Sequence, residues 1–470
     1  MTARARRARD RSVPVRGWRH ATGVIIGGSL VAAVVGSAIA ASLDAPELLL
    51  AVPVAVAALA AALLRPDLLF YAYCAAIPLS FALPPGPVGT VARIAGLAFF
   101  VGYVVRRPDS LRPSTIPGIG WVLLGWTTLS CLWAIDTQTA FSTWLSFAQL
   151  FAITVLIASL VAANPGTARN AIWSYSISAA ATAAIGAVTY LQSPAIFLTR
   201  AVAFSDQDPA MFASLIVPAA IFFMWELQSQ TSRIAVRLAA GVALVVCVAA
   251  LAVSGTRSSW VAIVAAVVLW LVLERRRRQF IAVAAVAFAV STLVVLMPGF
   301  GEFLVERTSS ALETGGAGRT NIWVVGLSLL ASAPLLGAGF GNFPVAFSPY
   351  AIAQAPAEAA TSVEVFAGRA PHNVLLGTVV ETGLVGGILV ITFFALALRQ
   401  PVRDGITNMI TAVLVGLIVQ SMFLDILLQK QLWLFVAIAY GLIAAGRASV
   451  QPAVERTAVL APMRRSRVFE

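Results

Sequence analysis

Apolar stretches of about 20 residues recur along almost the whole chain, and no other feature of the sequence constrains the fold as strongly. A stretch of that length spans the hydrocarbon core of a bilayer as one α-helix, because each helical residue adds about 1.5 Å along the axis. Hydrophobic residues make up 60% of the chain and charged residues only 11%, more apolar material than a soluble core could bury. The sequence therefore predicts an all-α fold, a polytopic bundle of transmembrane helices.

The spacing of these stretches predicts about 14 spans. The spans are expected near residues 21–42, 46–64, 67–83, 90–105, 116–134, 141–163, 171–191, 209–227, 235–253, 258–273, 279–297, 380–398, 406–424 and 431–446. Along the chain this gives an N-terminal arm at 1–20, spans 1–11 over 21–297, an outer loop at 298–376, spans 12–14 over 377–446 and a tail at 447–470. Because the first stretch is longer than a signal-peptide core, we expect it to remain as an uncleaved span.

Basic residues mark one side of the predicted membrane and identify the cytoplasmic face. They fill alternate short loops, such as RRPDSLRP at 106–113 and ERRRRQ at 274–279, whereas the first three loops on the other side contain no Lys or Arg. Both termini are therefore expected in the cytoplasm of a bacterial cell, with the protein in the inner membrane and the 298–376 loop outside. Within that loop, the apolar segment 321–332 is too short to span, and we expect a helix at the membrane surface.

Composition also disfavours several kinds of function. The net charge of +12 does not indicate nucleic-acid binding, because the basic residues are spread through short loops rather than gathered on one face. Cys74, Cys131 and Cys247 all fall in apolar runs, so we interpret them as buried hydrophobic side chains, not as disulfides or metal ligands. A transporter or flippase would be expected to show repeated halves and charges at mid-membrane depth, and the sequence favours neither.

A few cations on the outer side run against the charge bias. They are Arg200, Arg257, Arg307, Arg319, Arg369 and Lys430. A solvated charge or a lipid headgroup explains any single one, but the group favours a shared anionic ligand, because guanidinium donors match phosphate oxygens. Arg257 is the most informative, since the tight turn SGTRSSW holds it at the outer face, where a lipid-linked phosphate or diphosphate would carry its charge. A snorkelling side chain is the alternative for this arginine.

His372 is the one histidine expected outside, because the other, His20, lies in the N-terminal arm. A neutral imidazole accepts a proton, so His372 is a candidate general base for an incoming hydroxyl; a structural hydrogen bond is the alternative. Asp425 ends the thirteenth predicted span, and Glu381 follows the histidine in VVETGLVGG. A carboxylate in such a place either pairs with a cation, as Asp425 would with Lys430, or supports the site.

Two further motifs have competing interpretations. The D-x-D at 206–208 resembles the metal-binding carboxylates of many sugar-transfer enzymes, but Asp208 before Pro209 is favoured as the cap of the eighth span. The G-x-G-x-G at 337–341 lacks the βαβ setting of a dinucleotide site, and we expect a tight turn that brings backbone close to membrane or ligand. The glycines after Glu381 are expected to allow close helix packing.

Six pieces of sequence occur in an order that is typical of one family. They are SCLWAIDTQTAF at 130–141, an Arg followed by F-x-D-x-D-P at 200–209, SGTRSSW at 254–260, GRTNIW at 318–323 with PLLGAGFGNF at 334–343, PHNVLLGTVVETGLVGG at 371–387, and a late span ending in Asp425. From about residue 120 onward, the chain resembles the O-antigen ligase and Wzy-type polysaccharide polymerase superfamily, integral membrane glycosyltransferases of the GT-C class.

The resemblance implies transfer of a glycan from a polyprenyl-diphosphate donor to a hydroxyl of a glycan, lipid or protein acceptor on the outer leaflet, without a metal or other cofactor. It also implies a role for each matching residue: diphosphate binding for Arg257, Arg319 and, less distinctively, Arg200; catalysis for His372; and an acidic helper in Asp425. From the residues alone, Glu381 and Arg369 are added as candidate supporting residues.

The subgroup stays open at this stage, because about 14 spans exceed the 12 usual for the ligases. A ligase passes a finished glycan to another molecule, whereas a polymerase joins lipid-linked repeat units, and the sequence does not separate the two. We place the ligase-type transfer first and the polymerase close behind. A flippase and a metal-dependent sugar transfer through the D-x-D are less favoured.

Overall fold

The computed structural model describes residues 66–81, 90–106, 111–192, 200–204, 207–230, 232–274, 319–347, 370–402 and 404–459. Within these ranges the chain forms helices and no strand, so the expected all-α class is confirmed for them. The arm at 1–20, the predicted spans at 21–42, 46–64 and 279–297, and much of the 298–376 loop lie outside the described residues. The chain divides into two compact units.

The smaller unit contains most of two helices, α3 (Pro66–Ala76) and α4 (Val91–Arg106). Their aromatic side chains pack against one another. The ring of Phe99 lies 5.3 Å from that of Phe70, 6.2 Å from Tyr73 and 6.0 Å from Tyr103, between ring centroids. All four rings are buried, so apolar contact holds this helix pair together.

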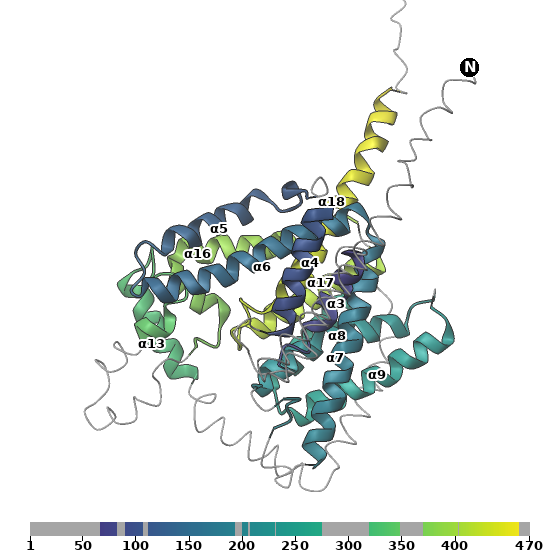
Figure 1. Ribbon diagram of the computed structural model, residues 1–470, viewed down its shortest axis with the longest axis horizontal. Helices are drawn as coiled ribbons and strands as arrows, with labels where there is room; N and C mark the ends of the chain where they lie inside the picture. Colours follow the sequence, from purple (N-terminus) through teal and green to yellow (C-terminus); the bar gives the residue numbers. More distant parts are fainter. Residues whose placement is uncertain are drawn as a thin grey trace, which may run out of the picture. The chain divides into compact units, whose positions relative to one another are not determined.

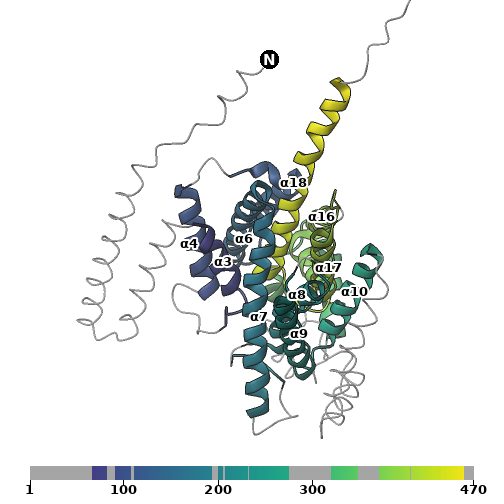
Figure 2. The same ribbon diagram turned by 90° about the vertical axis from the view of Figure 1, so that its right-hand side faces the viewer.

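The larger unit contains the remaining described helices. These are η2 (Pro113–Thr115), α5 (Gly118–Ser130), α6 (Thr137–Ala163), α7 (Gly166–Gln192), α8 (Pro209–Leu227), α9 (Ile234–Val253), α10 (Arg257–Glu274), α13 (Arg319–Ser332), α16 (Val374–Ala397), α17 (Gly405–Ser421) and α18 (Lys430–Val459). Helices α7, α8 and α9 pack together, and α10 and α17 pack on α8. Helix α18 contacts α6, α16 and α17 (Figures 1 and 2), and α5 lies beside α16 (Figure 1).

The core of this unit lies where α6, α16 and α18 meet. Trp433, near the start of α18, is 2% exposed, and its ring centroid lies 5.3 Å from that of Phe147 on α6 and 5.9 Å from that of Phe393 on α16. Its indole N–H donates to the carbonyl of Leu427 at 2.5 Å. The aromatic core therefore fixes the link between α17 and α18, which carries Asp425.

Seven of the described helices are long and apolar enough to cross a membrane, namely α6, α7, α8, α9, α10, α16 and α18. On α9, a stripe of exposed apolar side chains runs along one face through Ile234, Leu238, Val242 and Val245. Such a stripe in a soluble protein would be solvated at high cost, but it suits a lipid-facing helix. The total of about 14 spans stays a prediction.

Several expected boundaries differ from the structure; the helix in the span expected at 67–83, for instance, ends at Ala76. Two further differences concern later helices. The span expected at 380–398 belongs to a helix that starts at Val374 and is interrupted at Gly383, where the backbone leaves helical geometry (φ 69°, ψ −179°). The last span, expected to end at 446, continues as helix to Val459. Hydrophobicity alone cannot locate either boundary, because helical hydrogen bonding does not stop where apolar residues stop. The helix expected at 321–332 is present as α13.

Side-chain hydrogen bonds show which helix ends lie together. Gln420 at the end of α17 donates to Ser259 at the start of α10 at 2.8 Å, and Gln431 at the start of α18 donates to Ser214 near the start of α8 at 3.0 Å. We call this side of the larger unit the Arg257 end. At the opposite end, Asn408 donates to Glu274 at 2.9 Å.

Candidate functional site

Arg257 is the first residue of α10 and is exposed. The turn that precedes it contains Gly255 with φ +60°, a conformation that glycine adopts without strain. Arg200 braces this turn: its Nε donates to the Ser254 carbonyl and its Nη2 to the Thr256 hydroxyl, both at 2.8 Å. The structure therefore gives Arg200 a bracing role beside Arg257. Its predicted contact with a diphosphate stays a prediction.

Arg319 is the first residue of α13 and is half-buried. Burial lowers the pKa of its guanidinium, the positive charge of Arg257 lowers that pKa further, and the carboxylate of Asp208 raises it. The structure thus brings Arg257 and Arg319 within electrostatic reach of each other. Two cations within electrostatic reach of each other, one exposed and one half-buried, favour a multivalent anion near them.

Helix N-termini gather at the same place. Helices α10 and α13 begin at Arg257 and Arg319, and α8 begins at Pro209. The unpaired N–H groups of a helix N-terminus carry a partial positive charge that attracts anions. At α8 this charge is met by Asp208, whose side chain accepts from the N–H groups of Ala210 at 2.7 Å and Met211 at 3.1 Å. The predicted cap is confirmed, whereas Asp206 lies outside the described residues.

His372 lies two residues before α16, close to the start of α13. The indole of Trp323, one turn after Arg319, donates to the carbonyl of Pro371 at 3.2 Å. Asn373 then caps α16 by accepting from the Leu376 N–H at 3.0 Å. Hydrogen bonds therefore fix the backbone on both sides of His372. One of them comes from α13, the helix that starts with Arg319.

The backbone of His372 has φ +50°, a left-handed conformation that a non-glycine residue rarely adopts. Strain of this kind costs about 1–3 kcal/mol and persists where the surrounding structure imposes it, often at functional sites. The side chain is half-buried. The predicted role of His372 as a general base stays a prediction.

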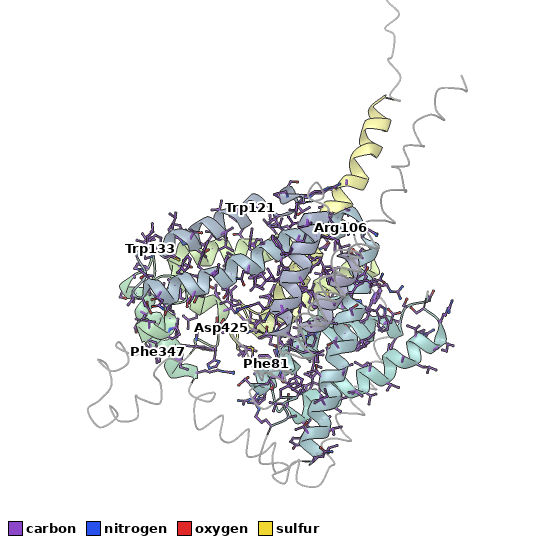
Figure 3. All side chains as sticks on the ribbon, viewed as in Figure 1. Phe81, Arg106, Trp121, Trp133, Phe347 and Asp425 are labelled. Atoms are coloured by element: carbon purple, nitrogen blue, oxygen red, sulfur yellow. The ribbon has the colours of Figure 1, made fainter. Side chains whose placement is uncertain are left out.

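Asp425 lies in the link between α17 and α18 and is half-buried (Figure 3). Burial raises the pKa of its carboxyl group, and the hydrogen bond from the Leu427 N–H opposes that rise. The carboxylate also interacts electrostatically with Glu381. The predicted pairing of Asp425 with His372 or Lys430 stays a prediction.

Residues 242–391 match the family model described as O-Antigen ligase. This segment belongs to the O-antigen ligase family. The match contains Arg257, Arg319, His372 and Glu381, and it ends before Asp425. No curated protein matches the chain at a significant level. With its seven apolar helices, the chain is a multi-pass integral membrane protein with an O-antigen ligase-type or polymerase function in polysaccharide biosynthesis.

The glycine motif of the O-antigen ligase segment forms the expected tight turns, with φ of +70° at Gly337, +96° at Gly339 and +76° at Gly341. Its close neighbours are other parts of the chain. A Cβ at Gly337 would meet the backbone of Glu381, and one at Gly341 would meet Thr143 on α6. The glycines bring this backbone against α16 and α6.

Gly383 differs from the expectation of close helix packing. It breaks α16, and a Cβ there would overlap the carbonyl of Leu335 in the preceding loop. The break admits the loop backbone into the helix. The expectation holds better at Gly386, where a Cβ would meet the side chain of Thr382 and a ring carbon of Trp126 on α5.

Sequence reasoning missed Gln207 as a polar group near the cations. Its side chain is 4% exposed; Oε1 accepts from the Ala203 N–H at 3.2 Å, while Nε2 has no hydrogen-bond partner among the residues that the structure describes. A buried amide donor without a partner costs free energy unless a ligand or water takes it. The D-x-D pattern points to the two flanking acids, whereas the amide of Gln207 stands out only because the structure shows that it is buried.

Other predicted residues have simpler outcomes. Arg307 and Arg369 lie outside the described residues. Cys74 and Cys247 are buried as expected, but Cys131 is half-exposed, because it follows the last residue of α5 at the end of the bundle. Lys430 begins α18. Within the described ranges, no group of three or more His, Cys, Asp or Glu residues is arranged to hold a metal ion.

Proposed function

We propose that the protein transfers a glycan from a polyprenyl-diphosphate carrier to an acceptor hydroxyl on the extracytoplasmic face of a bacterial inner membrane. The single observation that carries this proposal is the approach of Arg257 and Arg319, each the first residue of a helix. Guanidinium groups and helix N-termini are donors suited to diphosphate oxygens. The match of their segment to the O-antigen ligase family supports the same ligand.

The reaction needs little beyond charge and position. His372 accepts the proton of the acceptor hydroxyl as its oxygen attacks the anomeric carbon of the donor sugar. The bond between that carbon and the diphosphate oxygen breaks, and the polyprenyl diphosphate leaves with its electron pair. Arg257 and Arg319 stabilise the charge that develops on the leaving group. The diphosphate is a good leaving group, so the proposed transfer is independent of metal.

The proposal is tested with purified protein in proteoliposomes that contain a polyprenyl-diphosphate-linked glycan and an acceptor. We expect the wild type to release polyprenyl diphosphate and to form a new glycosidic bond. A ligase adds one glycan per acceptor, whereas a polymerase yields a ladder of repeat units. Absence of any turnover with such donors would contradict the function.

The site is tested by two pairs of variants in the same assay. His372→Ala is compared with His20→Ala, the only other histidine in the sequence, and Arg257→Ala with Arg399→Ala, an exposed arginine just beyond the other end of α16. We expect the first variant of each pair to lose at least about 100-fold in turnover, as is typical for a general base or a charge-stabilising donor. Normal turnover of both His372→Ala and Arg257→Ala would remove the site assignment.

A further inference from the structure

The interruption of α16 leaves backbone N–H and carbonyl groups without partners in the helix, and one loop forms hydrogen bonds with them. The N–H of Leu384 donates to the Pro334 carbonyl at 2.8 Å, outside its own helix. The carbonyl of Val380 accepts from Ala338 at 2.9 Å, and that of Glu381 from Gly339 at 2.8 Å. A break in an apolar helix persists only where protein groups satisfy its backbone. The loop between α13 and Phe343, residues 333–343, provides them; we call it the glycine loop.

The side chain of Glu381 holds the same loop a second time. Its carboxylate accepts from the N–H of Phe343 at 3.2 Å and from the N–H of Gly341. With its carbonyl bound to Gly339, one residue thus fastens three alternate amides of the glycine loop. A carboxylate within an apolar helix is costly, so its presence asks for a function.

The glycine loop is also fastened to the turn between α5 and α6. The N–H of Ile135 donates to the Ala338 carbonyl at 3.1 Å, and the indole of Trp133 donates to the Leu336 carbonyl at 3.0 Å. The side-chain carbonyl of Asn342 accepts from the Asp136 N–H at 2.7 Å. The loop therefore has a defined place between α16 and α6.

From the glycine loop, packing leads to the proposed site. Phe343 and Phe347 form one buried cluster with Ile322 of α13 and with Leu376 and Val380 of α16. Figure 3 shows Phe347 beside α13. The first residue of α13 is Arg319, and the Trp323 indole of the same helix holds the carbonyl before His372. A shift of the loop would therefore disturb the packing next to both residues.

We propose that Glu381 is a positioning residue, which clamps the glycine loop to the break in α16 and so sets where Arg319 and His372 stand. This inference rests on the proposed function for its catalytic readout. Glu381 is the eighth residue of α16, a rise of about 10 Å from the start of that helix, so we assign it an action through the loop and not by contact with the reacting atoms.

The first test measures amide hydrogen exchange of the detergent-solubilised protein and needs no substrate. Glu381→Gln keeps one acceptor oxygen and replaces the other by a donor, which cannot bind an N–H. We expect about tenfold faster exchange at Gly341 or Phe343, with exchange in α17 unchanged. Glu274→Gln is the matched control, because the carboxylate of Glu274 also accepts a hydrogen bond, in this case from the Asn408 side chain at the opposite end of the larger unit. Unchanged exchange in the glycine loop would overturn the clamp.

The second test measures kcat and donor KM in proteoliposomes, per amount of folded protein. For Glu381→Ala we expect kcat to fall about 100-fold, since a displacement of about 1 Å can cost that much, and for Glu381→Gln about tenfold. Donor KM should rise, because Arg319 shifts with the loop, but by a smaller factor than kcat falls, because Arg257 on the separate helix α10 still holds the donor. If only the yield of folded protein changes while kcat per folded protein does not, the positioning role is wrong.

The two tests separate this inference from the proposed function. A wild type without turnover would remove the proposed function and with it the catalytic role, whatever the exchange result shows. Normal turnover in the wild type and in both Glu381 variants would overturn the inference alone. Should Glu381→Ala fail to fold, Glu381→Gln decides by itself.

Discussion

Asp425 is the residue whose protonation ties the site to pH. Burial raises the pKa of its carboxyl group above the ordinary value of 3.8. Between that value and the raised one, the folded protein binds more protons than the unfolded chain, so the free energy of unfolding falls as pH rises through this window. Above the raised pKa, the folded protein carries the cost of a partly buried carboxylate.

Asp425→Asn is therefore expected to raise the midpoint of thermal unfolding in detergent at neutral pH. The amide oxygen still accepts the Leu427 N–H, but the buried charge is gone. The gain over wild type should shrink as pH is lowered toward 3.8, where the wild-type carboxyl group is protonated as well. Turnover of the variant should fall, because the proposed acidic helper is lost. A variant less stable than wild type at neutral pH contradicts this account.

Variants of Asp208 distinguish a helix cap from a metal ligand. Asp208→Ala removes the cap of α8 and should lower the free energy of unfolding by about 1 kcal/mol, whereas Asp208→Asn keeps a capping oxygen and should stay close to wild type. Thermal unfolding measures both. Chelator-treated protein should keep its turnover, so a loss restored by divalent metal would revive the D-x-D interpretation.

For single residues, the sequence predicts which side chains could take part in the chemistry but not how those side chains are arranged. The charge bias selected Arg257 and Arg319, and elimination selected His372, because each signal depends only on residue type and predicted side. The left-handed backbone of His372 and the buried amide of Gln207 depend on contacts across the fold. A local sequence pattern therefore cannot predict either feature.

Among the elements, α16 carries the most information about how the site is held. Its apolar residues predicted a span, and the span is there, but the break at Gly383 depends on the Leu335 carbonyl, 48 residues earlier in the chain, occupying the space of a side chain. A glycine among apolar residues has many uses, and hydrophobicity does not distinguish them. The cap of α8, by contrast, is a local feature, and the sequence predicted it.

Gly383→Ala should destabilise the protein by at least about 1 kcal/mol, because alanine is strained at φ +69° and its Cβ would overlap the Leu335 carbonyl. Gly125→Ala is the matched control, since that glycine lies in the middle of α5 with open space around it. Its effect should lie between zero and a gain of about 1 kcal/mol. Equal thermal unfolding of the two variants would mean that the break is not a fixed feature of α16.

For the whole molecule, hydrogen bonds place the end of α17 and the starts of α8, α10 and α18 at the Arg257 end, and the charge bias predicts that this end faces outward. The order of the predicted spans already places these helix ends on the same side, because consecutive spans alternate in direction.

Orientation is tested by cysteine labelling in a variant without the three native cysteines. Leu132→Cys lies in the α5–α6 turn, where the leucine is 79% exposed, and Asn164→Cys lies in the exposed turn between α6 and α7. A membrane-impermeant maleimide added to intact cells, with the outer envelope permeabilised where one exists, should label Leu132→Cys alone. Labelling of Asn164→Cys alone would invert the orientation and remove the outward-facing site.

The central claim is that Arg257 and Arg319 together hold a lipid-borne diphosphate. The direct measurement is the Kd of the purified protein for polyprenyl diphosphate and for polyprenyl monophosphate. We expect the wild type and Arg399→Ala to bind the diphosphate at least about tenfold more tightly, and Arg257→Ala with Arg319→Ala to lose that preference, since a charged hydrogen bond contributes about 1.5–3 kcal/mol. Equal Kd values for the two lipids in the wild type, or an unchanged preference in the double variant, would contradict the claim.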